Sequence, residues 1–439
     1  VPKGTEELSR RVGFTGNVNY IYNNRYFMDL SFRVDGSSLF GTKNKFAPFW
    51  SAGIGWNVHN EKFMQSQNIV NNLRIRGSYG ETGSQQFASY QALSTFQSYT
   101  GKRYIIWNGA ELMGLGNEKL KWQVTKQLNG GVEVGLFDGR LSASFDIYSK
   151  KTSNLLSQMD LPLANGFSSY VDNVGEVKNT GYEAMISGYL MRDTHRNIIW
   201  SMTAKLAYTK NEITKLSEAI KRQNELYKSK DVEINQLLYE GYAQNSIWAV
   251  PSMGIDPSTG YEIFLDKDGN ITDKWNPSDK RYFGVDEPKY RGNISTYFAW
   301  RDLSVNLSFA YQWGGQQYNE TLLNKVEVTN GEIDKNNVDS RVLKKRWQYI
   351  GDVKPYKGYG SVETKATSRF VMDDNVFQFQ SASVEYRLHS DFLRDKWKVE
   401  TISIGANMSD IFYISSIKRE RGTSYPFARR LALTLSLMF

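Results

Sequence analysis

Residues 302–313 read DLSVNLSFAYQW, and apolar side chains alternate with small or polar ones along the whole stretch. The apolar series consists of Leu303, Val305, Leu307, Phe309, Tyr311 and Trp313. A period of two is typical of a β-strand with one apolar and one polar face. Ten steps of about 3.3 Å, tilted by about 40°, rise roughly 25 Å, which is the height of the apolar band of a transmembrane β-barrel. The stretch therefore predicts a membrane-spanning strand, because soluble strands average only about 5–6 residues.

The same alternation recurs along the chain, for example in residues 28–35, 141–148, 202–208, 402–409 and 431–439. From these segments we predict about thirteen strands. They lie near residues 12–22, 25–35, 48–58, 71–80, 127–137, 140–150, 178–190, 197–210, 289–300, 302–313, 375–388, 397–409 and 428–439.

The connections between these strands fall into two classes that alternate along the chain. Short ones include Asn23-Asn24 and Asp138-Gly139, which are natural hairpin turn residues because they tolerate positive φ. Long ones cover roughly residues 36–47, 81–126, 151–177, 211–288, 314–374 and 410–427. Outer-membrane barrels have short periplasmic turns and longer extracellular loops. We therefore expect the long loops to be extracellular and the C-terminus to be periplasmic.

The number of strands indicates how much of a barrel the 439 residues supply. Bacterial single-chain barrels have an even number of strands, and the first predicted strand here leads into a short turn. An odd number of strands is therefore expected before it, as in the plugged class of about 22 strands, with about nine absent here. We predict an all-β fold in which residues 1–439 form the C-terminal portion of a transmembrane antiparallel β-barrel, and residues 211–288 form a long extracellular loop.

Several motifs occur in the order seen in one family of transporters. They are RVDGSSLFG (33–41), LRIRGSYGETG (73–83), Trp122 followed by Thr125, Asn129 and Gly131, NTGYE (179–183), PKY (288–290), SRFV (368–371) and Tyr425-Pro426 with Arg429. This order resembles the C-terminal half of the SusC/RagA-type TonB-dependent transporters. Ala428 departs from the proline-like residue expected there, which affects only local loop geometry.

The resemblance implies a partner set and a location. A SusD-like surface lipoprotein would deliver an oligosaccharide or peptide ligand from outside, and TonB would supply energy from the periplasm. TonB would act through an N-terminal part, since the signal peptide, TonB box and plug domain are not recognisable in this sequence. The resemblance also implies the outer membrane of a Gram-negative bacterium, contact with its lipid and lipopolysaccharide, and a dimer of transporter–lipoprotein pairs.

Aromatic residues of the long loops are the candidates for ligand contact, because aromatic faces stack on sugar rings and hold peptide side chains. They are Tyr104, Trp107, Trp248, Trp275 and Tyr282. Packing within the loops, or a place in an aromatic girdle, is the alternative role for each. The terminal Phe439 ends an alternating strand and resembles the signal read by the barrel-assembly machinery, with a second role in barrel closure.

Two local structures are expected inside the long loop 211–288. Asp268-Gly269 follows the apolar run Tyr261–Leu265 and predicts a hairpin turn. Ile213, Leu216, Ile220 and Tyr227 have helical spacing and predict a short amphipathic helix. Such a helix would face the lipoprotein or pack on its own loop.

The composition argues against other classes of protein. The sequence has no cysteine, which excludes disulfides, zinc fingers, iron–sulfur clusters and cysteine catalysis, and its three histidines lie far apart. It shows no hydrolase, zinc-protease or phosphate-loop motif, so we expect no enzyme, cofactor or metal site. The formal charge of +8 is spread among 46 acidic residues, so no nucleic acid partner is expected. A passive porin-like or adhesion barrel is the main alternative, and a soluble glycan-active β-protein is a third.

Overall fold

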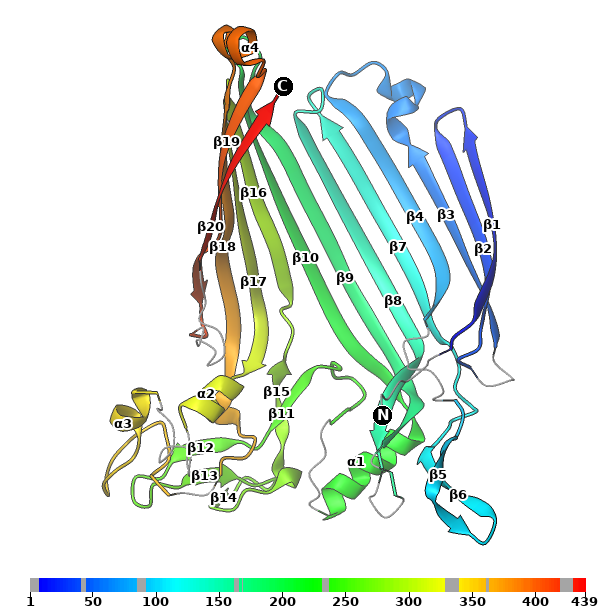
Figure 1. Ribbon diagram of the computed structural model, residues 1–439, viewed down its shortest axis with the longest axis vertical. Coiled ribbons are helices and arrows are strands. Elements are labelled where there is room, and N and C mark those ends of the chain that lie inside the picture. Colours follow the sequence, from blue (N-terminus) through cyan, green and yellow to red (C-terminus); the bar gives the residue numbers. More distant parts are fainter. Residues whose placement is uncertain are drawn as a thin grey trace.

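A computed structural model describes residues 8–40, 45–84, 92–161, 166–167, 169–230, 237–327, 339–360, 363–418 and 429–439. Thirteen strands form one antiparallel sheet in which each strand pairs with its neighbours in chain order (Figure 1). The strands are β1 (Arg11–Tyr22), β2 (Tyr26–Ser37), β3 (Phe46–Asn57), β4 (Val70–Ser84), β7 (Gln123–Leu136), β8 (Leu141–Asp160), β9 (Ser169–Asp193), β10 (Ile198–Leu216), β16 (Tyr290–Trp300), β17 (Leu303–Tyr318), β18 (Val371–Leu388), β19 (Thr401–Ser415) and β20 (Arg430–Met438). The predicted all-β fold and its thirteen strands are confirmed.

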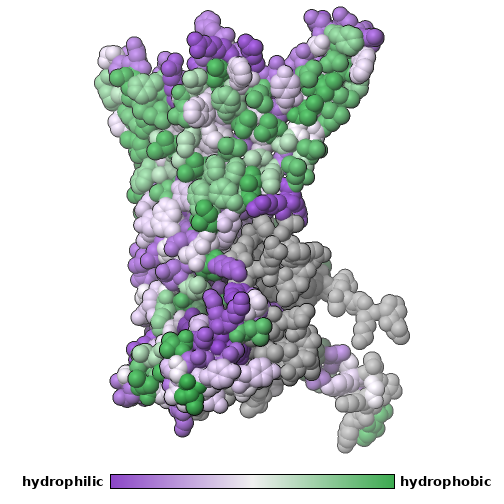
Figure 2. All heavy atoms as spheres, turned by 90° about the vertical axis from the view of Figure 1, so that its left-hand side faces the viewer, coloured by the Kyte–Doolittle hydropathy of each residue, from purple (hydrophilic) through white to green (hydrophobic). Residues whose placement is uncertain are grey.

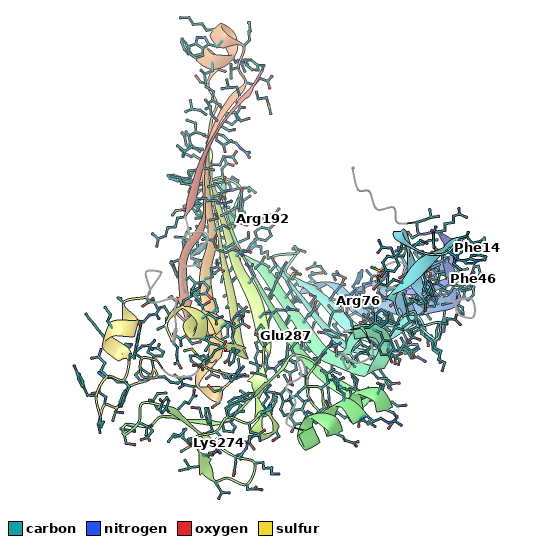
Figure 3. All side chains as sticks on the ribbon, turned by 60° about the horizontal axis from the view of Figure 1, so that its bottom comes forward. Phe14, Phe46, Arg76, Arg192, Lys274 and Glu287 are labelled. Atoms are coloured by element: carbon teal, nitrogen blue, oxygen red, sulfur yellow. The ribbon has the colours of Figure 1, made fainter. Side chains whose placement is uncertain are left out.

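The sheet is a curved wall with two open edges. Within the described part of the chain, β1 pairs only with β2 and β20 pairs only with β19. Seen from the loop end, Phe14 and Phe46 mark one end of the curve, and β18–β20 form the other, across the concave side (Figure 3). The described strands therefore form part of a barrel.

The two faces of the wall differ in polarity. The register places Leu307 opposite Thr296 and Ala382, and the next position on that face pairs Val305 with Phe298. This face forms a broad apolar belt nearer the turn end, with hydrophilic surface above and below it (Figure 2). Such a belt matches the lipid-facing band of a transmembrane barrel.

The opposite face of the strands is polar. Ser308 pairs with Ser295 on one side and Ser381 on the other, and its hydroxyl accepts a hydrogen bond of 2.8 Å from the Asn293 amide. Arg76, which lies on the concave side in Figure 3, contacts Asp146 at 2.7 Å. The alternation read from the sequence therefore separates a lipid-facing surface from a hydrophilic interior.

An unbroken row of aromatic rings crosses the middle strands at the loop side of the apolar surface. The rings of Tyr182, Tyr208, Tyr290 and Trp313 follow one another on adjacent strands, with centroids 5.1, 5.1 and 5.3 Å apart. Aromatic girdles of this kind mark the membrane–water interface of β-barrels. The row therefore marks where the membrane span ends and the loops begin.

Short turns and long loops lie at opposite ends of the sheet (Figure 1). In the first turn Asn23 and Asn24 have φ of 51° and 55°, and in another Asp138 and Gly139 have φ of 56° and 75°. These are the left-handed conformations that the turn residues predicted. In the described part of the chain, no helix is long and apolar enough to cross a membrane.

The ends of some strands differ from the prediction. β8 and β9 run for 20 and 25 residues, because their ladder continues beyond the membrane span as a two-stranded ribbon. β19 begins at Thr401 rather than at residue 397, because the helix α4 (Asp391–Trp397) occupies the preceding segment. The Ser390 hydroxyl caps this helix by accepting from the Phe392 N–H, and Lys398 ends it with φ of 57°.

The long loops fold into small elements around the loop end. They comprise the hairpin β5 (Thr95–Tyr104) and β6 (Trp107–Gly114), helix α1 (Glu218–Lys230), the pair β11 (Ser246–Ala249) and β15 (Arg281–Val285), the sheet β12 (Ser252–Ile255), β13 (Glu262–Leu265) and β14 (Ile271–Thr272), and the short helices α2 (Glu320–Lys325), α3 (Arg341–Lys345) and η5 (Ser368–Phe370). The predicted hairpin at Asp268-Gly269 is present as β13–β14, and β12 adds a third strand to it.

The helix predicted in the same loop begins later than its residue spacing suggested. Ile213 and Leu216 belong to the last part of β10, and α1 starts at Glu218. Ile213, Leu216 and Ile220 share one buried cluster with Val177 and Leu238. The helical spacing therefore arises from a strand end and the first turn of a helix that pack on the same core, so Ile220 packs on its own loop.

Candidate functional site

Residues of the sequence motifs converge on one aromatic cluster at the loop ends of β2, β3, β4 and β7. Phe40 stacks on Trp122 with centroids 4.4 Å apart, and Phe49 meets the same indole at 5.8 Å. A Cβ added at Gly83 would overlap the Phe49 ring, so only glycine fits there. These motif residues hold the loop ends together, which is a structural role. Tyr425, Pro426 and Ala428 lie outside the described residues.

A pocket of about 690 Å³ lies next to this cluster. It is lined by both aromatic and charged side chains, among them Trp122, Arg11, Arg33, Asp35 and Glu81. Arg33 and Asp35 form an ion pair of 2.6 Å across one edge of the pocket. The pocket therefore offers hydrogen-bond donors and acceptors beside an aromatic surface, as sites for polar organic ligands do.

A second group of charges lines the hydrophilic face of β4, β7 and β8. Arg76 bridges Asp146 at 2.7 Å and Glu133 at 3.4 Å, and the Arg74 guanidinium stacks on the Phe27 ring at 4.2 Å. Arg74, Arg76 and Asp146 line a depression of about 520 Å³. This part of the wall presents paired charges toward the barrel interior.

Four aromatic rings meet at the loop ends of β10 and β17, and we call them the loop aromatic cluster: Tyr239, Tyr242, Trp248 and Tyr282. Trp248 on β11 is the register partner of Tyr282 on β15. The Trp248 ring lies 4.8 Å from Tyr239, 5.1 Å from Tyr242 and 5.9 Å from Tyr282. Two of the sequence candidates, Trp248 and Tyr282, are therefore brought together.

The loop aromatic cluster is anchored on the wall and open to solvent. The Ile213 N–H of β10 donates to the Tyr242 carbonyl at 2.8 Å, so the backbone of the cluster is tied to a barrel strand. Tyr242 and Tyr282 remain 39% and 43% exposed. Burial raises the pKa of the Tyr239 and Tyr282 hydroxyls above the ordinary value, so both stay protonated donors at neutral pH.

Tyr239 and Tyr242 were not among the residues that the sequence singled out. The segment YEGYAQNSIW, residues 239–248, places both within a few positions of Trp248, and that local density of aromatics was the available signal. The pairing of this segment with residues 281–285 depends on the β11–β15 ladder, which the sequence did not reveal.

The other candidate residues lie apart from this cluster. The Trp275 indole donates to the Ala366 carbonyl at 3.1 Å and lies half-buried beneath the Lys280 ammonium group, which is 5.8 Å from the ring. Trp107 is 71% exposed at the β5–β6 hairpin, and the side chain of Tyr104 lies outside the described parts. Phe439 directly follows β20 and is 78% exposed.

A buried charge cluster joins three loop segments beneath the small sheet β12–β14. The Arg369 guanidinium donates to both carboxylate oxygens of Glu262, at 3.1 and 3.0 Å, and also to Glu327. Glu262 and Glu327 have side chains that are only 2% and 0% exposed. Burial alone would lower the Arg369 pKa, but the hydrogen bonds with Glu327 and Glu262 raise it, so the arginine is permanently charged.

This cluster has a structural rather than a catalytic arrangement. The Thr364 hydroxyl donates to Glu327 at 2.8 Å, so each carboxylate has a hydrogen-bond partner. Burial also raises the pKa of the neighbouring Tyr318 to about 12. Among the residues whose positions are described, no group of three or more histidine, aspartate or glutamate side chains could hold a metal ion.

A curved antiparallel wall with an apolar belt, an aromatic girdle, a polar inner face and loops gathered at one end is the wall of a transmembrane β-barrel. The family model of the TonB-dependent receptor-like β-barrel matches residues 7–407, and the chain belongs to this family. TonB-dependent receptors are β-barrels of the Gram-negative outer membrane, which gives the location of this chain.

Individual relatives agree with this assignment. The chain is 29% identical to TonB-dependent receptor P3 of Formosa agariphila, over 95% of this chain and 41% of the relative. It is 25% identical to TonB-dependent receptor SusC of Bacteroides thetaiotaomicron, over 75% of this chain and 34% of the relative. The chain therefore spans less than half the length of these relatives.

Solved structures show the same fold. The RagAB peptide transporter superposes with a TM-score of 0.80 at 24% identity, over 94% of this chain and 45% of the other. The open-open state of the RagAB peptide importer gives a TM-score of 0.82 at 22% identity, over 98% of this chain and 47% of the other. The resemblance to SusC/RagA-type transporters read from the sequence motifs is confirmed.

Proposed function

We propose that this chain forms the C-terminal barrel wall of a SusC-like importer for oligosaccharides or oligopeptides. The observation that carries the proposal is the thirteen-strand wall with its lipid-facing belt and polar concave face, in a chain of the TonB-dependent receptor family. In the whole protein, TonB energises uptake and a SusD-like lipoprotein delivers the ligand. The chain contributes a wall and loops to this process and has no enzymatic role.

The proposed orientation puts the long loops outside the cell and the C-terminus in the periplasm. The short turns support it, because they all lie at the α4 end of the sheet. Outer-membrane barrels keep their short turns in the periplasm. Phe439 would then face the assembly machinery and lie at the closing edge of the barrel.

The loop aromatic cluster is the proposed ligand platform. Its two most exposed rings, Tyr242 and Tyr282, lie 5.0 Å apart and present flat apolar faces with hydroxyl groups at their edges. Such rings bury the apolar face of a sugar or an amino acid side chain and lose little conformational entropy in doing so. The Trp248 Nε1 is buried without a hydrogen-bond partner among the described residues, which leaves one donor suited to an ordered water beneath the platform.

Replacing Trp248 or Tyr282 with alanine should weaken ligand binding by about 1–2 kcal/mol, or roughly five- to thirtyfold, because central aromatic rings dominate small interfaces. The measurement is isothermal titration of the full-length receptor in detergent with oligosaccharide and oligopeptide mixtures. Tyr261→Ala is the matched control, because Tyr261 is 52% exposed in the same loop but outside the cluster. If Tyr261→Ala and Tyr282→Ala lowered the ligand affinity equally, the loop aromatic cluster would not be the binding site.

The transport proposal is tested in cells that produce the full-length protein. Uptake of a labelled oligosaccharide or peptide should require this gene and should stop when TonB is removed. Uptake that persists without TonB would indicate a passive pore instead. Cells that adhere to a surface through this protein but import nothing would support the adhesion alternative.

A further inference from the structure

Three lysines lie side by side on the middle strands of the wall, just beyond the aromatic row. Lys126 on β7 is the register partner of Lys151 on β8, and Lys151 is the partner of Lys178 on β9. These three strands are neighbours in the centre of the sheet (Figure 1). All three residues are exposed, and we call them the lysine row.

The register fixes the face of the wall on which the lysine row lies. Lys150, one residue before Lys151, lines the depression of the hydrophilic face together with Arg76 and Asp146. Its ammonium group lies 4.9 Å from the centre of the Tyr148 ring, which lines the same depression. Because successive residues of a strand point to opposite faces, Lys151 points the other way. The lysine row therefore lies on the convex face, which turns toward lipid.

The height of the lysine row matches the layer of lipid head groups. Lys178 lies four residues from Tyr182 on β9, and Tyr182 belongs to the aromatic row. Four steps of about 3.3 Å, tilted by about 40°, rise roughly 10 Å. Head groups extend about 5–7 Å beyond the hydrocarbon core, and flexible lysine side chains bend back toward such a layer. The ammonium groups can therefore reach the head groups of the adjoining lipid.

The lysine row carries an electrostatic cost. Like charges directly opposite each other on neighbouring strands destabilise a sheet, and the row contains two such pairs in succession. Glutamates offset part of this cost, since Glu81 lies 3.0 Å from the Lys126 ammonium group and Glu176 lies 2.7 Å from that of Lys151. The remaining repulsion is reduced most by an anion that contacts more than one lysine.

Lys178 lies opposite a carboxylate that is already engaged. Its register partner on β10 is Glu212, which lies 2.8 Å from the Lys210 ammonium group. Its partner on the other side is Lys151. An anion between Lys151 and Lys178 would contact two cations on strands about 5 Å apart. Phosphate suits this position, because its oxygens accept charge-assisted hydrogen bonds from several lysines.

Small hydroxyl side chains lie between the lysine row and the aromatic row. Ser149 is the register partner of Thr180, and Thr180 is the partner of Lys210. Both hydroxyl residues lie two positions from the lysine row on their strands and therefore share its face. Their small size leaves space beneath the ammonium groups, and their hydroxyls can donate to an anion. The surface thus offers cations and neutral donors at one place.

We propose that the lysine row, with Lys210, Ser149 and Thr180, binds a phosphate group of lipopolysaccharide in the outer leaflet of the outer membrane. The inference rests on the proposed function, whose orientation puts the loop side of the wall outside the cell. A lipid phosphate is favoured over a soluble anion, because the site lies on the lipid-facing surface beside the aromatic row. The bound phosphate offsets the repulsion between lysines and so stabilises β7–β9 at the membrane surface.

The test measures the dissociation constant of purified lipopolysaccharide for the detergent-solubilised full-length receptor. The triple variant K126Q/K151Q/K178Q should raise this constant about tenfold and reduce its dependence on salt, because the paired cations are lost. Lys150→Gln is the matched control, since Lys150 neighbours the row but lines the hydrophilic face, and it should leave the constant unchanged. A heat-modifiable gel shift confirms that each variant is folded.

A single variant keeps the test valid if the triple variant does not fold. Lys178→Gln leaves the ion pairs of Lys126, Lys151 and Lys210 in place and should raise the dissociation constant about threefold. If the folded variants bound lipopolysaccharide as tightly as Lys150→Gln does, the inference would be overturned.

Two further ligands identify the group that is bound. Lipopolysaccharide from which the phosphates have been removed should bind the wild-type receptor about tenfold more weakly and should not distinguish it from the triple variant. Inorganic phosphate should compete with the lipid only weakly. Equal affinity for the two forms of the lipid would exclude phosphate recognition, and strong competition by inorganic phosphate would assign the site to soluble anions instead.

The orientation is tested separately from the affinity. The 439 residues contain no cysteine, so Ile106→Cys adds one labelling site to this part of the receptor, at the exposed turn of the β5–β6 hairpin. A membrane-impermeant maleimide should label this variant on intact cells. Labelling only after the outer membrane is permeabilised would contradict the proposed orientation, whereas the affinity of the lysine variants tests the phosphate site itself.

Discussion

Replacing Arg369 with methionine is expected to destabilise the loop region by about 3–5 kcal/mol, because it leaves two buried carboxylates without their partner. Glu262 and Glu327 are almost inaccessible to water, and Arg369 donates to both. The guanidinium also donates to the Pro355 carbonyl at 2.6 Å, so its loss releases three segments at once. Faster amide hydrogen exchange in β12, β13 and the segment after α2 would report this release in the full-length receptor.

Two further variants separate charge from packing. The triple variant R369M/E262M/E327M should recover much of the stability, since a fully apolar replacement of a buried ion cluster is often near neutral. Arg387→Met on β18 removes an exposed ion pair with Glu385 and should cost less than about 1 kcal/mol. If the amide hydrogens of these loop segments exchanged no faster in Arg369→Met than in Arg387→Met, the buried cluster would not hold the loops together.

Replacing Leu307 with arginine is expected to impair barrel assembly. It should make the free energy of folding into the membrane less favourable by roughly 2–4 kcal/mol, the cost of a charge on the lipid face near mid-bilayer. Leu307 lies on the apolar face of β17 between Thr296 and Ala382. Its neighbour Ser308 faces the hydrophilic interior and contacts Asn293. Ser308→Arg is therefore the matched control and should have a much smaller effect.

The assembly experiment uses the full-length protein in outer membranes. The fraction that shows a heat-modifiable gel shift measures correctly folded barrel, and it should fall for Leu307→Arg and change little for Ser308→Arg. Equal yields of both variants would contradict the faces assigned to β17. The same comparison on another strand would show whether the belt continues around the wall.

The sequence predicted the wall more fully than the loops for a physical reason. A strand between lipid and water must alternate along its own length, because successive side chains point to opposite faces. That constraint acts on each residue separately, so residues 302–313 alone predicted the two faces of β17, although the strand itself runs from Leu303 to Tyr318. The alternation of short and long connections likewise arises from crossing the same membrane repeatedly, and both features were confirmed by the sheet.

The loop structure could not be predicted in the same way. The residues 213–227 have helical spacing, but the spacing is shared between the end of β10 and the start of α1, because both pack on one cluster. Individual loop aromatics could be named from the sequence. Nothing local distinguished Trp248 and Tyr282, which meet other rings, from Trp275, whose indole is bonded to Ala366.

The sequence by itself determined a membrane-spanning antiparallel wall, its two faces, its turn end and its loop end. Only the tertiary structure decided which loop residues meet. Arg369 binds Glu262 and Glu327 across 107 and 42 residues of chain, and the Trp347 indole donates to the Pro257 carbonyl in another loop. The periodicity of a strand is set by its local environment, whereas these contacts depend on how distant segments close on one another over the barrel.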